Sequence, residues 1–132
     1  MEKEGWLTQR KQAQAFWSQS RADFATAVTL IDAGVYYASV FFSQQAAEKA
    51  LKAVAISAHH RHPKGHHLIQ IANSINAPIE VMNAAAELNV EFLASRNPEV
   101  VDGVPAQMYD CDSARIHLQA ASDILDWAKR EM

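Results

Sequence analysis

Imidazole side chains are the groups in this chain best suited to acid–base or metal chemistry. Five of them fall within nine residues, and the cluster consists of His59, His60, His62, His66 and His67, with Arg61 and Lys64 among them. Three interpretations are open: a solvated loop, a Zn²⁺ or Ni²⁺ site, or an anion site beside Gly65 and a helix start. The segment holds no carboxylate or thiol that would complete a metal site. We therefore predict no metal and no cofactor, and we prefer the solvated loop.

A second polar group lies on one flank of the segment 44–52. Gln45, Glu48 and Lys52 share this flank when the segment is projected as a helix. Glu48 followed by Lys52 is the favourable order for an i,i+4 ion pair, which is worth about 0.2–0.5 kcal/mol. The alternative is a polar cluster that orients a ligand or the long loop. Spacing alone favours the ion pair.

Size and composition limit the possible classes of protein. The 132 residues suit one domain with one core. The formal charge of −3 argues against general affinity for polyanions, because phosphate binding comes mainly from Lys and Arg, although a local basic site remains possible. The single cysteine, Cys111, excludes an internal disulfide framework and suits a reducing cytoplasm. The sequence shows no signal-peptide pattern after Met1 and no apolar run long enough to span a membrane.

The elements that must position these residues are predicted to be helices. Apolar spacing predicts them over about 7–33, 35–59, 66–75, 78–96 and from about 110 to the end, with 97–109 as an ordered loop. The helix over 78–96 is expected to bury Ile79, Met82, Ala86, Val90 and Leu93. Gly34 ends the first helix, and the short link predicts an antiparallel hairpin. Either Asp110 or Asp112 caps the last helix. The prediction is one all-α domain, an antiparallel up-and-down bundle of about five helices.

The helix predicted over 35–59 is apolar on two sides. The stripe expected to face the core is Val40, Gln44, Ala47, Leu51, Val54 and Ala58, in which the Gln44 amide needs a partner. The opposite side is Ala38, Phe42, Ala46, Lys49, Ala53 and Ile56. A helix apolar on two sides is buried on two sides. We predict a homodimer with this helix near the interface. The alternative is a central helix covered wholly by its own bundle.

Four segments, in this order along the chain, resemble the HEPN domain family. They are Tyr36-Tyr37-Ala38 with the run 44–52, Gly65-His66, the turn 95–99, and Tyr109 before a helix with Ala114 and Ala121. The similarity extends from Trp17 to Trp127. It implies a helical bundle and frequent dimerisation. It also implies association with nucleotides or nucleic acids, often beside a minimal nucleotidyltransferase in toxin–antitoxin-like pairs.

The resemblance also raises the question of ribonuclease activity. Many members cleave RNA with an arginine that holds the phosphate and a histidine a few residues later that acts as acid or base. Arg96 stands at the arginine position here, but Val101, Asp102 and Gly103 occupy the places where the histidine would follow.

Two details bear on the missing histidine. Pro98 and Glu99 resemble the branch that lacks the ribonuclease histidine, whereas Asn97 departs from the aromatic residue usual in that branch. Arg61 and His66 have a similar spacing, but they lie in the loop after the second helix.

We therefore predict a non-catalytic, cytoplasmic homodimer that acts as a nucleotide- or nucleic-acid-associated binding module, or as the partner of a nucleotidyltransferase. The expected phosphate-binding side chains are Arg96, Lys49, Lys52 and His66, and the expected polar cluster is Gln45, Glu48 and Tyr109. One alternative is a metal-independent ribonuclease that uses Arg96 or Arg61 with a loop histidine. The other is a purely structural oligomerisation domain.

Overall fold

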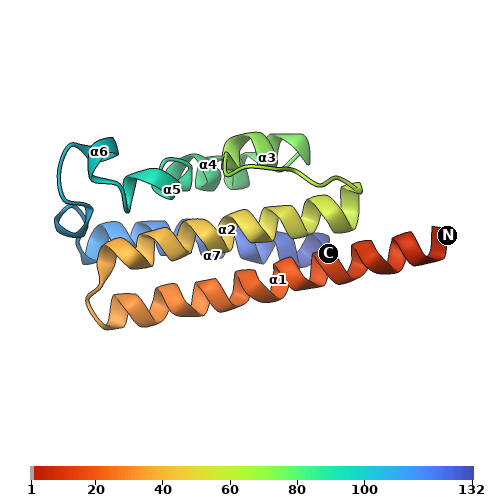
Figure 1. Cartoon of the computed structure of the whole chain (residues 1–132), viewed down its shortest axis with the longest axis horizontal. Helices are drawn as coiled ribbons and strands as arrows, with labels where there is room; N and C mark the ends of the chain where they lie inside the picture. Colours follow the sequence, from red (N-terminus) through yellow and green to blue (C-terminus); the bar gives the residue numbers. More distant parts are fainter. Residues whose placement is uncertain (1) are drawn as a thin grey trace.

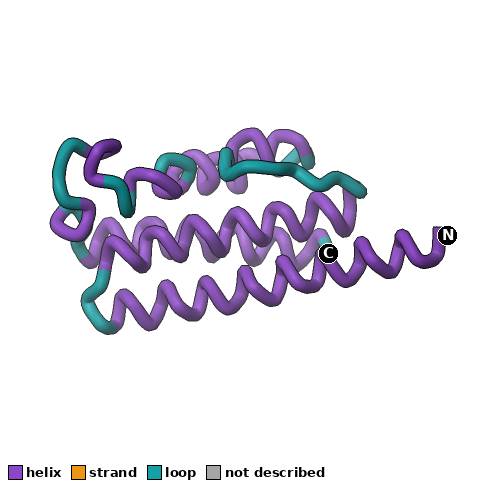
Figure 2. The backbone as a smooth tube through the Cα atoms, in the orientation of Figure 1, coloured by secondary structure: helices purple, strands orange, loops and turns teal. Residues whose placement is uncertain are grey.

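The computed structural model describes residues 2–132, with side chains from residue 5 onward. Its three long helices are α1 (Glu2–Asp32), α2 (Tyr36–His59) and α7 (Cys111–Glu131). The chain between α2 and α7 forms α3 (Leu68–Ser74), α4 (Ile79–Leu88), α5 (Glu91–Ala94), α6 (Pro98–Val101) and the 3-10 helix η1 (Pro105–Gln107). In Figure 1 these short helices return along α2, opposite α1, before α7 begins. Figure 2 shows helix and loop but no strand over residues 2–132, which confirms the all-α prediction.

The hairpin of α1 and α2 forms as predicted. Gly34 has φ +76°, a left-handed conformation that costs glycine little. Its N–H donates to the Ile31 carbonyl at 2.9 Å, and the Val35 N–H donates to Leu30 at 2.8 Å. These bonds satisfy carbonyls that the end of α1 leaves free, so the chain reverses within three residues.

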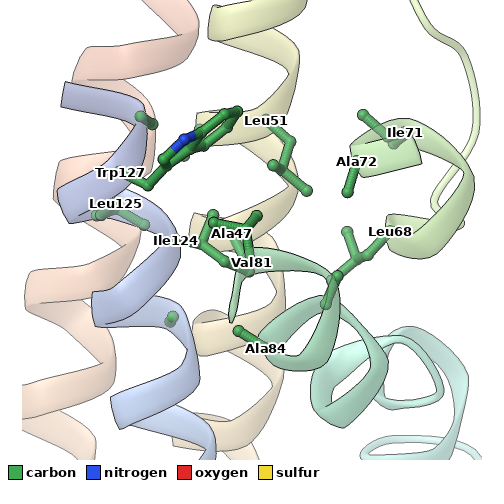
Figure 3. Packing of buried hydrophobic residues seen from close by; sticks show 14 of the residues in the cluster. Ala47, Leu51, Leu68, Ile71, Ala72, Val81, Ala84, Ile124, Leu125 and Trp127 are labelled. Atoms are coloured by element: carbon green, nitrogen blue, oxygen red, sulfur yellow. The ribbon is translucent and has the colours of Figure 1, made fainter. Parts of the chain in front are cut away.

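Helix α2 is the centre of the bundle. Its predicted core stripe is fully buried from Val40 to Val54, while Ala58 at its end is exposed. Figure 3 shows Leu51 and Ala47 among residues of α3, α4 and α7. On the opposite side Ala46, Ala53 and Ile56 are also buried, and α1 is the helix that packs there. Its own bundle therefore covers much of both sides of α2, although Ala38, Phe42 and Lys49 are only half-buried, and the predicted homodimer no longer follows from this face.

The predicted helix over 78–96 is wrong in two respects. It ends at Leu88, and the single turn α5 follows after Asn89 and Val90. Its buried residues are Val81, Ala84, Ala85 and Leu88, whereas the predicted Ile79 and Val90 are 67% and 63% exposed. This segment is apolar on two sides, so periodicity gave two equivalent faces. Packing against α7 selected the face that carries Val81, Ala84, Ala85 and Leu88.

The segment 97–109 is more regular than a loop. Pro98 begins α6 and Pro105 begins η1, both at positions where the missing N–H of proline costs nothing. Asp110 caps α7, because it accepts the Ser113 N–H at 2.8 Å while the Ser113 hydroxyl accepts the Asp110 N–H at 3.0 Å. This reciprocal pair decides between the two predicted caps in favour of Asp110. Across the described residues, no helix has both the length and the apolar character needed to cross a membrane.

Candidate functional site

A buried carboxylate on α2 organises the first part of the site. Glu48 is 4% exposed and accepts three hydrogen bonds. They come from Gln44 Nε2 at 3.2 Å, Lys52 Nζ at 3.2 Å and His66 Nδ1 at 2.9 Å. A buried carboxylate needs such partners, because it has lost its water. The i,i+4 ion pair therefore exists as predicted, and Glu48 also holds His66, in the loop before α3.

The bond to Glu48 fixes the state of the His66 ring. An ionised carboxylate only accepts hydrogen bonds, so Nδ1 of His66 carries a proton and Nε2 is left for other partners. The side chain is 47% exposed. A carboxylate that orients an imidazole in this way is a common arrangement in acid–base sites.

Phe92 on α5 brings His66 and Arg96 together. The His66 ring stacks on Phe92 with a centroid distance of 3.7 Å and an interplanar angle of 14°. The Arg96 guanidinium carbon lies 4.5 Å from the Phe92 centroid and 4.7 Å from that of Phe41 on α2. Arg96 Nε also donates to the Phe92 carbonyl at 2.8 Å. We call Phe41, Glu48, His66, Phe92 and Arg96 the Arg96 site.

The Arg96 guanidinium keeps most of its donors for a ligand. The Nε donor is the one it uses within residues 2–132, and the side chain is exposed. A planar guanidinium with free Nη groups matches the geometry of a phosphate. Contact with two aromatic rings limits its rotamers, so less entropy is lost when an anion binds.

An apolar groove lies beside the Arg96 site and shares His66 and Phe92 with it. It has a volume of about 330 Å³, and its other lining residues are His67, Asn89, Val90, Leu93 and Val100. Val90, Leu93 and Val100 are large apolar residues that the single chain leaves exposed.

The structure brings only some of the predicted phosphate-binding residues together. Lys52 reaches the Arg96 site through its ion pair with Glu48. Lys49 does not, because its ammonium group bonds to Asp23 on α1 at 2.6 Å and to Gln45 Oε1 at 3.1 Å. Lys49 therefore joins α1 to α2.

The predicted polar cluster separates into two. Gln45 and Glu48 belong to one chain of hydrogen bonds on α2, in which Gln45 donates to Gln44 and Gln44 donates to Glu48. The Gln44 amide thus has the partners that its core position required. Tyr109 belongs to a different cluster, with Glu91 on α5 and His117 on α7.

This second cluster joins α5 to α7 and to Tyr109 just before it. The Tyr109 hydroxyl donates to Glu91 Oε1 at 3.0 Å, and His117 Nε2 lies 3.3 Å from Glu91 Oε2. Burial raises the pKa of the Glu91 carboxyl, although His117 and Tyr109 act to lower it. Burial and the adjacent Glu91 raise the pKa of the Tyr109 hydroxyl, so it remains a donor.

Glu91 and His117 were missed as members of a site. The available signal was His117 itself, a titratable residue that helical spacing places in line with Ala114 and Ala121 on the last helix. A polar residue on a buried face requires a partner. The sequence does not indicate that the partner comes from residue 91, in another helix.

His60 and His67 serve local structure. His60 ends α2 with φ 52°, and its Nδ1 lies 3.1 Å from Gln9 Oε1. His67 caps α3 by accepting the Gln70 N–H at 3.2 Å. The start of α3 is thereby occupied, which weakens the anion interpretation there. No group of three or more potential metal ligands occurs within residues 2–132. Arg61 donates to the Ser74 carbonyl at 2.9 Å, whereas His66 bonds to Glu48 and stacks on Phe92.

Comparison with known proteins gives the chain a family. The HEPN domain profile matches residues 13–131. The crystal structure of TT1696 from Thermus thermophilus superposes with a TM-score of 0.85 at 25% identity, covering 92% of this chain and 98% of that one. ST0689, described as an archaeal HEPN homologue, superposes with a TM-score of 0.80 at 28% identity, covering 90% and 96%. No curated protein matches significantly. The profile match over nearly the whole chain shows that this protein belongs to the HEPN domain family.

Proposed function

We propose that this protein is a binding module for nucleotides or single-stranded nucleic acid, and that it holds a phosphate group at the Arg96 site. One observation supports this most directly: the Arg96 guanidinium rests on Phe41 and Phe92 with its Nη donors unused within residues 2–132. His66 stacks on the same Phe92 ring and so places a polar imidazole near the guanidinium.

The charge of the site agrees with an anionic ligand. Arg96 and Lys52 are cations, and the carboxylate within the Arg96 site, Glu48, is buried and already bonded to Lys52 and His66. The site is thus locally basic on a chain whose formal charge is −3. Binding would depend on this one surface and not on the overall charge.

The biological setting that we infer is that of the family. The protein would act in the cytoplasm as the partner of a minimal nucleotidyltransferase in a toxin–antitoxin-like pair. It would form a homodimer through the apolar groove beside the Arg96 site, because Val90, Leu93 and Val100 are left exposed there. That contact would bring two Arg96 sites near each other.

A second candidate function is metal-independent RNA cleavage. The usual histidine is absent at Val101, Asp102 and Gly103, but His66 reaches Arg96 through Phe92. Glu48 leaves Nε2 of His66 free to take the proton of a ribose 2′-hydroxyl. The 2′-oxygen would then attack the phosphorus, and the 5′-oxygen would leave with a proton from water.

Two RNA probes separate binding from cleavage. Fluorescence anisotropy with a short single-stranded RNA should give saturable binding that Arg96→Ala weakens about tenfold or more. Arg115→Ala is the matched control, since Arg115 is an exposed arginine on α7. Equal losses in both variants would mean that only overall charge matters, and no binding of RNA or nucleotide would favour a purely structural domain.

Cleavage is then measured by gel with the same RNA and with a 2′-deoxy version. A cyclic phosphate product that requires the 2′-hydroxyl and disappears in His66→Gln would establish the second function. Intact RNA at saturating protein would exclude it and leave the binding function in place.

A further inference from the structure

We propose that Glu91, Tyr109 and His117 are positioning residues for the Arg96 site, and that phosphate binding there depends on one proton shared by Glu91 and His117. The inference rests on the proposed function, because it concerns the same arginine. These three residues act through α5, the helix that carries Phe92.

The hydrogen bonds define where the proton must be. His117 Nδ1 lies 2.7 Å from the Ser113 carbonyl, which only accepts, so Nδ1 carries a proton. His117 Nε2 lies 3.3 Å from Glu91 Oε2, and this contact closes only when a proton lies between the two atoms. Without it, two lone pairs face each other in a buried site. The other carboxylate oxygen accepts from Tyr109.

The cluster is mechanically connected to Arg96 by a very short helix. α5 has four residues and no side-chain cap, so tertiary contacts hold it in place. Glu91, at its start, is 4% exposed. The next residue, Phe92, supplies both the ring that contacts His66 and Arg96 and the carbonyl that accepts Arg96 Nε. A shift of α5 therefore moves every anchor that Phe92 provides.

Other titratable groups lie on the helices and loops around the cluster. Helix α5 packs against α2, whose titratable residues are Tyr36, Tyr37, Glu48, Lys49, Lys52 and His59, and against α6, which carries Glu99. Glu80 and Glu87 lie on α4, and the first turns of α7 carry Cys111, Asp112 and Arg115 beside His117, with His66 and Asp110 in the adjoining loops. Glu48, Lys49 and Lys52 are already paired. Repulsion from Glu87 reinforces burial in raising the pKa of Glu91. Both effects favour retention of the shared proton.

The variant Glu91→Gln separates the effect of holding α5 in place from the effect of the shared proton. Its amide oxygen can accept from Tyr109, and its amide N–H can donate to an unprotonated His117 Nε2, so the cluster is complete without the shared proton. Glu91→Ala leaves both partners unsatisfied. The probe is a fluorescently labelled short single-stranded RNA, titrated by anisotropy between about pH 6 and 9.

The dissociation constant of the wild type should rise about tenfold more over this range than that of Glu91→Gln. His66 is present in both proteins, so its contribution to the pH dependence cancels in their ratio. Glu91→Ala should bind weakly at every pH. A ratio independent of pH, or wild-type affinity in Glu91→Ala, would overturn the proposal.

A measurement on the free protein keeps this test separate from RNA binding itself. The His66 ring protons report the place of Phe92 by NMR, because the two rings are stacked at 3.7 Å. In the wild type these signals should show a second pH-dependent shift that Glu91→Gln lacks. If the wild type fails to bind RNA, the proposed function fails, and the NMR comparison still decides the positioning role. Identical titrations of His66 in both proteins would show that Glu91 does not position α5.

Discussion

At the scale of the residue, hydrogen-bond partners explain which polar side chains the core accepts. Ser20 and Ser39 are fully buried, and their hydroxyls donate to Ala46 and Ala27 carbonyls at 2.6 and 2.7 Å. Ser43 is equally buried on α2, yet its hydroxyl has no partner within the described residues. An unpaired buried hydroxyl retains its full desolvation cost. Ser39 and Ser43 are therefore a matched pair with opposite predictions.

Ser43→Ala should raise the free energy of unfolding by about 1 kcal/mol, because it removes an unsatisfied group. Ser39→Ala should lower it by about 1 kcal/mol, because it removes a satisfied one. Urea unfolding followed by circular dichroism measures both. Similar losses in the two variants would show that Ser43 has a hydrogen-bond partner.

At the scale of the element, the buried pair of Glu91 and His117 stabilises α5, a helix of four residues that is too short to be stable alone. α5 depends on Glu91, whose pKa burial raises above its ordinary value of 4.5. A raised folded-state pKa means that the folded protein binds this proton more tightly than the unfolded chain does. The resulting stabilisation is fully present at pH values below the ordinary carboxyl pKa, and it is lost as pH rises through the raised pKa of the folded state.

The melting temperature of the wild type should therefore fall relative to that of Glu91→Gln as pH rises from about 5 to 9. The glutamine variant has no proton to lose at this position. Glu80→Gln, an exposed position on α4, should follow the wild type. Scanning calorimetry across this range gives the comparison, and parallel curves for wild type and Glu91→Gln would contradict it.

The start of α7 gives a second prediction at this scale. Asp110→Ala removes the carboxylate that accepts the Ser113 N–H and leaves only the bond from its own backbone N–H to the Ser113 hydroxyl, so it should lower the melting temperature. Asp112→Ala, in the first turn of the same helix, should lower it less, because it retains the cap. Equal changes would mean that only the charge near the helix N-terminus matters.

At the scale of the whole molecule, an apolar groove with the exposed residues Val90, Leu93 and Val100 lies beside the Arg96 site. We expect a mass of two chains, each of 14.6 kDa, by sedimentation equilibrium. Leu93→Asp should shift the protein toward one chain, because it places a charge on a residue that is 49% exposed in the groove. Ile116→Asp on α7 is the control at another exposed apolar residue. A wild-type mass of one chain would refute the homodimer.

Local signals in the amino-acid sequence were sufficient to predict the three long helices and α3, and motif resemblance predicted the family. Helical periodicity, Gly34 and the alternative caps Asp110 and Asp112 are signals of this kind, since they act through residues one helical turn or less apart. They placed α1, α2, α3 and α7 within a few residues and indicated that α2 is buried on two sides. Arg96 was found as an isolated motif residue.

The surroundings of Arg96 depend on contacts that arise only when the helices pack. Glu48 and His66 are separated by 18 residues, and so are Glu91 and Tyr109. No periodicity links such positions, because their contact depends on how the short helices fold back on α2. The same packing selected the buried face of α4, where the sequence offered two. A bundle fixes contacts between helices only after all of them are packed, and for this reason the helices could be predicted while the assembled site could not.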